Sequence, residues 1–303
     1  MEGWRYNSSG RTLSDHHNCG KPGRQSAKKV VIKICRGGVC QTPLMGWTSW
    51  NAFKSTVTQA DIERQAQALV ESGLASLGYQ YVNLDSTWQG EYGGAYNAVM
   101  PNEKFPDMKK MCDTIHSLGL KCGIYSTPMK EAWGAAAGHE KDRIYPGCTR
   151  GEWDDRYRTA YPIGREHYER NNVAQWCDWG FDYLKYDWGH YCDLENAELM
   201  RKALEESPRD FGYCVTVAAM LDLADYWSQN CQSWRNNPDS WEMWERMKQI
   251  CFTPDDWAQY CNPGHFFDLD MLEIGVICKN HAEKPFCYDR CSLTENEQLV
   301  GYT

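Results

Sequence analysis

Short apolar runs alternate with helical patterns along most of the chain, and this alternation predicts parallel βαβ units. The runs are rich in β-branched and aromatic residues, and each ends in or beside a polar residue. They are Leu44–Trp47, Tyr79–Asp85, Lys121–Tyr125, Tyr183–Asp187, Tyr213–Val217, Cys231–Arg235 and Phe266–Leu272. Since strands joined through helices pair in parallel, the pattern predicts one parallel sheet.

The segments between these runs carry apolar residues at helical spacing. The first begins with a capping pattern at Thr58 and Asp61 and ends at Gly73. Similar stripes occupy residues 108–118, 173–179, 197–204 and 241–250, and we interpret them as helix faces that cover the sheet. Residues 127–165 interrupt the pattern with a polar stretch rich in glycine and aromatic residues, which predicts a loop insertion over the functional face.

The ends of the chain differ from its middle. Residues 1–40 hold eight Lys or Arg and two acidic residues, so we expect a flexible basic lead-in with a short strand at 29–35 at most. We expect residues 41–303 to form the main domain, with residues 127–165 as its loop insertion and an incomplete C-terminal end. A capped helix start at Leu293–Val300 follows the seventh run, and we expect no eighth strand. An open edge favours aggregation, so we expect a fragment that is aggregation-prone and weakly active or inactive when expressed alone.

Composition excludes several classes of protein. The 32 basic and 41 acidic residues give a net charge of −9, which disfavours nucleic acid and anionic membranes as partners. A mean hydropathy of −0.68 and the lack of a long apolar run argue against a membrane span. Fifteen cysteines, an odd number, without an apolar signal segment favour the reducing cytoplasm. The pairs Cys35/Cys40 and Cys287/Cys291 lack matched partners, so we expect no metal and no cofactor.

Functional side chains follow nearly every predicted strand. They are Trp47 and Trp50, Asp85, Tyr125, Lys185, Asp187, Thr216, Arg235, Asp268 and Asp270. An open sheet would collect its site at one switch point, usually beside a glycine-rich phosphate turn, and no such motif is present. Groups on many strand ends favour an α/β fold of the (β/α)8 TIM-barrel type, here truncated after its seventh strand.

Carboxylates beside indole rings are typical of a sugar site. Glycoside hydrolysis needs one carboxylate to attack the anomeric carbon and another to protonate the leaving oxygen. Asp187 is the candidate nucleophile, because Lys185 lies on the same strand face and favours the ionised form. Asp239 is the candidate acid, in a loop against Trp234 and Trp241. Taken singly, such groups are more often helix caps or structural ion pairs.

A series of ordered motifs resembles glycoside hydrolase family 27, the α-galactosidases and α-N-acetylgalactosaminidases, in a bacterial, melibiase-like type. The motifs are Thr42-Pro43-Leu44-Met45-Gly46-Trp47-Thr48-Ser49-Trp50-Asn51, Tyr81-Val82-Asn83-Leu84-Asp85, Phe105-Pro106-Asp107-Met108-Lys109, His116-Ser117-Leu118-Gly119, Lys121-Cys122-Gly123-Ile124-Tyr125, Leu184-Lys185-Tyr186-Asp187, Trp234-Arg235 with Asp239, and Asp268-Leu269-Asp270-Met271. They run in order from Thr42 to Gly275.

The resemblance implies a retaining hydrolase on a (β/α)8 barrel, with Asp187 as nucleophile and Asp239 as acid/base. It also implies a sugar subsite lined by Trp50, Asp85, Tyr125, Lys185, Arg235 and Asp270. The resembled family carries an antiparallel β-domain after its barrel, and we expect no counterpart of it in these 303 residues. The expected substrate is a terminal α-galactosyl residue of an oligosaccharide or glycoconjugate, and the oligomeric state stays open.

The chain departs from the family pattern at several positions. Ser86 replaces a second aspartate that grips the galactose 4- and 6-hydroxyls, which weakens the galactose preference. Thr216 and Ala219 replace a glutamate and a bulky residue near the sugar 2-position, as in the N-acetylgalactosaminidase branch. Gly189 stands where the family has a cysteine that forms a disulfide. A disulfide between Cys148 and Cys192 could replace it, but the predicted reducing cytoplasm argues against any such bond.

Other hypotheses about the function remain open. Within the family, the alternative activities are those of an α-N-acetylgalactosaminidase, a β-L-arabinopyranosidase and an isomaltodextranase. A catalytically silent sugar-binding module is another, although both Asp187 and Asp239 are present. A class I aldolase would use Lys185 for a Schiff base, which a lysine kept protonated by Asp187 does not favour.

Overall fold

The computed structural model describes residues 39–132, 145–154, 162–188, 194–216, 220–240, 244–252 and 255–272. The chain divides into two compact units, Met1–Ile34 and Cys35–Thr303, and every described residue belongs to the second. The predicted strand at 29–35 and the predicted helix start at 293–300 lie outside the described residues. The division into a lead-in and a catalytic domain therefore stays a prediction.

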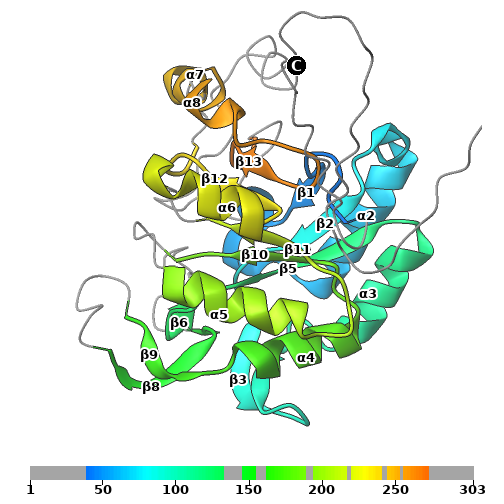
Figure 1. Cartoon of the computed structure of the whole chain (residues 1–303). Helices are drawn as coiled ribbons and strands as arrows, with labels where there is room; N and C mark the ends of the chain where they lie inside the picture. The colour runs from blue at the N-terminus through cyan, green and yellow to red at the C-terminus, as the bar shows by residue number, and fades with distance from the viewer. Residues whose placement is uncertain are drawn as a thin grey trace, which may run out of the picture. The chain divides into compact units, whose positions relative to one another are not determined.

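Seven parallel strands form one sheet, in the order β1-β2-β5-β10-β11-β12-β13 (Figure 1). Their bounds are β1 Gly46–Thr48, β2 Tyr81–Leu84, β5 Lys121–Ser126, β10 Tyr183–Tyr186, β11 Gly212–Val215, β12 Ser233–Arg235 and β13 Phe266–Asp268. The predicted parallel sheet is confirmed. Strand β13 is shorter than predicted, because Asp270 adopts a φ of 74°, outside the range of an extended strand.

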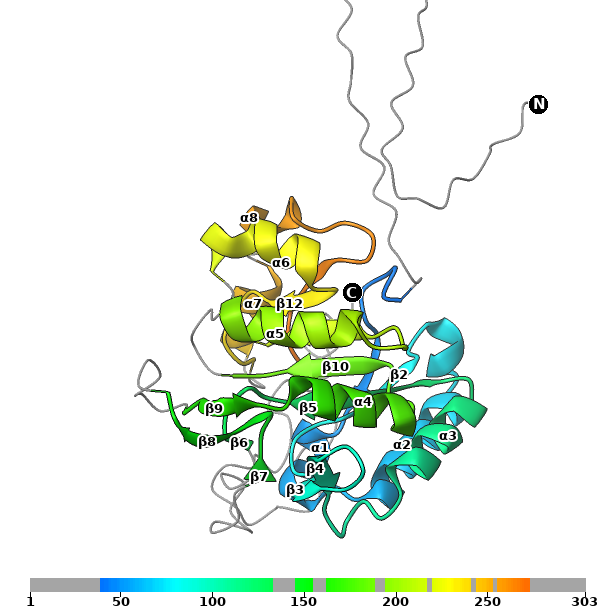
Figure 2. The ribbon, with the colours of Figure 1, turned by 60° about the horizontal axis from the view of Figure 1, so that its bottom comes forward.

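Among the helices, α2, α3, α4, α5 and α6 cover the outer face of this sheet in chain order (Figure 2). The bounds of the helices are α1 Trp50–Phe53, α2 Gln59–Glu71, α3 Met108–Ser117, α4 Glu169–Trp179, α5 Leu194–Glu205, α6 Ala224–Asn230, α7 Trp244–Cys251 and α8 Asp255–Ala258, with the short 3-10 helices η1 Lys54–Thr56, η2 Leu74–Leu77 and η5 Leu221–Leu223. Helix α2 has the predicted cap, since Thr58 and Asp61 bond each other's side chain and backbone. In the described part of the chain, no helix is both long and apolar enough to cross a membrane.

Strand alternation gives the sheet two different faces. The face toward the helices belongs to the main apolar core, which includes Val82, Leu84, Cys122, Ile124, Leu184, Tyr186, Tyr213, Val215 and Trp234. On the inner face Tyr81, Tyr183 and Cys214 pack with Cys40 in a separate cluster. A Cβ on Gly123 would lie 1.9 Å from Oδ1 of Asn83, so the glycine is needed for this inner packing.

The sheet is curled as in a (β/α)8 barrel. One oxygen of Asp85, Oδ2, accepts hydrogen bonds from Thr48 of β1 at 3.4 Å and from Lys185 of β10 at 2.7 Å, although two strands separate β1 from β10 in the sheet. A flat sheet would separate them by about three times the 4.8 Å strand spacing. The predicted barrel-type fold is therefore confirmed, with seven strands in the described residues.

Antiparallel hairpins extend two of the loops after the strands. They pair β3 (Gln89–Gly93) with β4 (Ala98–Pro101), β6 (Glu131–Ala132) with β7 (Tyr145–Pro146), and β8 (Thr149–Trp153) with β9 (Gly164–His167). The pair β6–β7 and strand β8 lie within the predicted insertion 127–165, whereas β9 runs two residues past its end, and the extent of the insertion stays a prediction. The first was not predicted, although the Gly93-Gly94 pair is typical of a hairpin turn and Gly94 has a φ of 67°.

Candidate active site

The carboxyl ends of the strands bring the predicted site residues onto the inner face of the sheet. In the strand register Lys185 is paired with Tyr125 on one side and with Cys214 on the other, and Arg235 is paired with Asp268. Because side chains alternate along a strand, Asp187 lies on the same face as Lys185, one step nearer the carboxyl edge. Ala219 lies outside the described residues.

A buried ion pair connects β2 to β10 across the inside of the sheet. The Nζ of Lys185 lies 2.7 Å from Oδ2 of Asp85, and their side chains are 16% and 3% exposed. The hydroxyl of Thr48 donates to the same carboxylate at 3.4 Å. Burial alone would lower the pKa of Lys185, but the carboxylates of Asp85, Asp187 and Asp270 raise it above its usual range. A protonated lysine is the opposite of what Schiff-base chemistry requires, which disfavours the aldolase reading.

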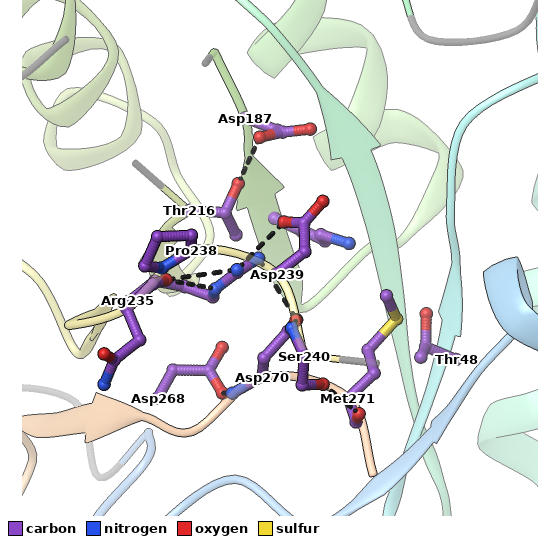
Figure 3. Close-up of polar contacts among 12 residues, drawn as sticks. Thr48, Asp187, Thr216, Arg235, Pro238, Asp239, Ser240, Asp268, Asp270 and Met271 are labelled. Carbon is purple, nitrogen blue, oxygen red and sulfur yellow. Dashed lines mark hydrogen bonds and ion pairs between the residues drawn. The ribbon is translucent and has the colours of Figure 1, made fainter. Parts of the chain in front are cut away.

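Two hydroxyl groups hold the carboxylate of Asp187. Tyr125 donates to Oδ2 at 3.0 Å. Thr216 donates to Oδ1 at 2.7 Å (Figure 3). Burial raises the pKa of Asp187 above its usual value, and the charges of Lys185 and Arg235 partly oppose this rise. The carboxylate of Asp239 raises the same pKa further, as a like charge close by does.

Arg235 links two more of the predicted residues. Its Nη2 donates to Oδ1 of Asp239 at 2.9 Å, and its Nη1 lies 3.1 Å from Oδ1 of Asp270. The guanidinium is 6% exposed, and burial opposes the effect of both acids, which raise its pKa above the usual range. For Asp270 burial acts in the opposite direction and raises the pKa, against the lowering effect of Arg235 and Lys185. Asp239 itself is 71% exposed.

The expectation that Asp239 lies against Trp234 is wrong. Trp234 is fully buried in the helix-facing core, where its ring lies 6.4 Å from that of Trp257. Strand alternation places its neighbour Arg235 on the inner face, so the guanidinium is the contact of Asp239. Trp241 lies outside the described residues.

Trp50 and Ser86 occupy loop positions beside the strand ends. Trp50 opens helix α1 directly after β1, and the Nζ of Lys54 lies 5.1 Å from its ring centroid. Ser86 is 1% exposed, and its amide donates to Asp85 at 2.7 Å. In the part of the chain that the structure describes, its buried hydroxyl has no hydrogen-bond partner. Thr87, next in the chain, has a φ of 80°, which is rare for a β-branched residue and strains this turn.

Sequence reasoning missed several residues that support the site. Ser49 accepts the amide of Asp85 at 3.0 Å, Ser240 donates its amide to Asp270 at 2.6 Å, and Thr48 contacts Asp85. Strand alternation could have placed Thr48 in the site, since it lies two positions after Gly46 on the inner face of β1. No sequence pattern pointed to Ser240. Within the described ranges, no three His, Cys, Asp or Glu side chains form a group that could hold a metal.

This curled parallel sheet, with charged groups at its carboxyl ends, defines a protein of the (β/α)8-barrel class. The family model described as Alpha galactosidase A (Melibiase_2) matches residues 42–284. The chain belongs to this family, and the resemblance to glycoside hydrolase family 27 is confirmed.

Named relatives agree with this assignment. Alpha-galactosidase 3 of Arabidopsis thaliana is 35% identical over 87% of this chain and 56% of its own length. The alpha-galactosidase of Oryza sativa is 30% identical over 92% of this chain and 62% of its own. The chain thus spans about three fifths of the length of these two relatives.

Solved structures show the same fold. Alpha-galactosidase I from Mortierella vinacea has a TM-score of 0.65 at 26% identity, over 80% of this chain and 62% of that one. A β-L-arabinopyranosidase of family 27 from Geobacillus stearothermophilus has a TM-score of 0.69 at 22% identity, over 85% of this chain and 68% of that one. At that identity the second likeness concerns the fold alone.

Proposed function

We propose that the protein is a retaining glycoside hydrolase that removes terminal α-galactosyl residues from oligosaccharides or glycoconjugates. The observation that carries this proposal is the carboxylate of Asp187, oriented by Tyr125 and Thr216 and electrostatically coupled to a second, exposed carboxylate at Asp239. Retaining hydrolysis uses two such carboxylates about 5–5.5 Å apart. The bacterial type expected from the sequence stays a prediction.

The reaction has two displacements. An oxygen of Asp187 attacks the anomeric carbon while Asp239 gives its proton to the leaving oxygen, so the glycosidic bond breaks and a glycosyl ester forms. Asp239 then takes a proton from water, whose oxygen attacks the anomeric carbon and releases Asp187 as a carboxylate. The hydroxyl donors on Asp187 keep it oriented for attack, and Lys185 and Arg235 offset part of its cost of burial.

The remaining predicted residues are proposed to bind the sugar. Asp85 and Asp270 present carboxylate oxygens to its hydroxyl groups, and Trp50 presents an indole face to the apolar side of the ring. Among the described residues, the buried hydroxyl of Ser86 has no hydrogen-bond partner. Ser86 and the short Thr216 remove bulk and charge relative to the family pattern, so discrimination against related sugars is proposed to be weak.

A panel of nitrophenyl glycosides tests the substrate. We expect turnover of the α-galactoside, with the β-L-arabinopyranoside or the α-N-acetylgalactosaminide within about a hundredfold, because discrimination of about one to three kcal/mol per unpaired polar group is lost. The α-glucoside serves as the control for the 4-hydroxyl. A preference for galactoside above a hundredfold over every other sugar would contradict weak discrimination. Binding of galactose with no turnover of any glycoside would favour a sugar-binding module.

The pH dependence of kcat/KM tests the environment of Asp187. The nucleophile has to be ionised, and its pKa is raised by burial, so activity is lost on the acid side at a higher pH than for an ordinary aspartate near pKa 3.9. The Thr216 hydroxyl lowers this pKa. We therefore expect Thr216→Val to move the acid limb to higher pH and Thr216→Ser to leave it near the wild-type position. If the acid limb of the pH profile stayed in place in Thr216→Val, that limb would report the ionisation of a group other than Asp187.

For location, we propose the reducing cytoplasm. Support comes from nine cysteines that are free thiols in the described part of the chain. Six of them are buried: Cys40, Cys112, Cys122, Cys148, Cys214 and Cys231. Thiol titration of the denatured protein, alkylated on cell lysis, tests this. Fifteen reactive thiols are expected, and two fewer would point to one disulfide, with Cys148 and Cys192 the first pair to examine.

A further inference from the structure

The loop that carries Asp239 is exposed at its centre. Residues 236–240 follow β12 without regular structure, Pro238 and Asp239 are exposed, and the Asp239 side chain is 71% exposed. A carboxylate that transfers a proton has to stay within hydrogen-bond reach of the leaving oxygen. Hydrogen bonds from neighbouring elements therefore have to set the position of Asp239.

One arginine closes a ring of such bonds around the loop (Figure 3). Arg235 binds Oδ1 of Asp239 at 2.9 Å and Oδ1 of Asp270 at 3.1 Å. The other oxygen of Asp270 accepts the amide of Ser240 at 2.6 Å. Because Ser240 directly follows Asp239, the ring returns to its starting point through the backbone.

Two further side chains tie the same loop to elements outside the ring. The hydroxyl of Ser240 donates to the carbonyl of Met271 at 2.8 Å, which joins the loop to the segment after β13. From helix α7, Arg246 donates to the carbonyl oxygens of Asp239 and Pro238 at 3.0 and 2.9 Å. These bonds reach the backbone on both sides of the Asp239 side chain.

We propose that Ser240 and Arg246 are positioning residues for the acid/base carboxylate of Asp239. This inference rests on the proposed function and adds to it two residues that act only through the loop backbone. Their loss lets the loop shift relative to the sugar, and a shift of about 1 Å costs up to about a hundredfold in rate. The cost falls on proton transfer to the leaving group and spares the attack by Asp187.

The test uses aryl glycosides of the preferred sugar, from 2,4-dinitrophenyl to phenyl, with the variants Ser240→Ala, Arg246→Gln and their combination. A dinitrophenolate leaves with almost no help from an acid, whereas phenolate needs a proton. We expect the double variant to lose about tenfold or more in kcat/KM on the phenyl glycoside and less than about threefold on the dinitrophenyl glycoside.

Matched controls separate positioning from general damage. Lys248→Gln alters a neighbouring cation on α7 that pairs with Glu245 at 2.7 Å, and Ser240→Thr retains the hydroxyl. Both should keep the wild-type dependence on the leaving group. An equal loss across the whole series in the double variant would overturn the inference. If kcat/KM depended steeply on the leaving group in Asp239→Ala but as in the wild type in the double variant, only the positioning inference would be overturned. Inactivity of the wild type on every glycoside would overturn the proposed function as well.

Discussion

Replacing Asp187 with alanine is expected to lower kcat by about 10⁴-fold or more, because the variant lacks the carboxylate that we propose as the group that forms the glycosyl ester. The cavity left by the carboxylate lies beside the donors of Tyr125 and Thr216, which then have space for a small anion. Azide should restore part of the activity and give a glycosyl azide with inverted configuration. The measurement is hydrolysis of the dinitrophenyl glycoside, with product stereochemistry read by NMR.

The matched variant is Asp239→Ala. It retains the nucleophile, so it should keep more activity on the dinitrophenyl glycoside, and azide should react at the glycosyl ester to give a product of retained configuration. Retained product from Asp187→Ala would reverse the two assignments. Full activity in either variant would remove that residue from the chemistry.

Replacing Lys185 with methionine is expected to have the largest effect on stability. Asp85 is 3% exposed and lies 2.7 Å from the ammonium, so the variant leaves a buried carboxylate without its cation. Breaking a buried pair in this way costs about 3–5 kcal/mol, and the midpoint of thermal unfolding should fall by roughly 10 °C. Calorimetry or circular dichroism at neutral pH measures this shift.

The chain offers an exposed pair as the control. Lys109 and Asp113 lie 3.1 Å apart with side chains 57% and 60% exposed, so Lys109→Met should change stability by less than about 1 kcal/mol. Adding Asp85→Asn to Lys185→Met should recover part of the lost stability, since it removes the unpaired charge. A thermal midpoint of Lys185→Met within about 2 °C of wild type would mean that water or a rearranged partner compensates Asp85.

The order and type of the main elements could be predicted from the sequence because the signals are local. Alternation with a period of two placed Lys185 and Asp187 on one strand face, and helical spacing with a Thr58 cap located α2. Strand ends were less accurate: the positive φ of Asp270 ends β13 early, and such a conformation depends on the bonds that the carboxylate makes with Arg235 and Ser240.

The candidate site was predicted as a set of residues, but their pairings were not. The strand-end pattern by itself determined that Asp85, Tyr125, Lys185, Asp187 and Arg235 gather at one edge, since the carboxyl ends of parallel strands meet there. Only the tertiary structure decided that Lys185 pairs with Asp85, a hundred positions away in the chain, and that Asp239 lies exposed against Arg235 rather than against Trp234. These contacts depend on the curl of the sheet and on loop conformation, which arise from interactions between distant segments and leave no periodic signal in the sequence.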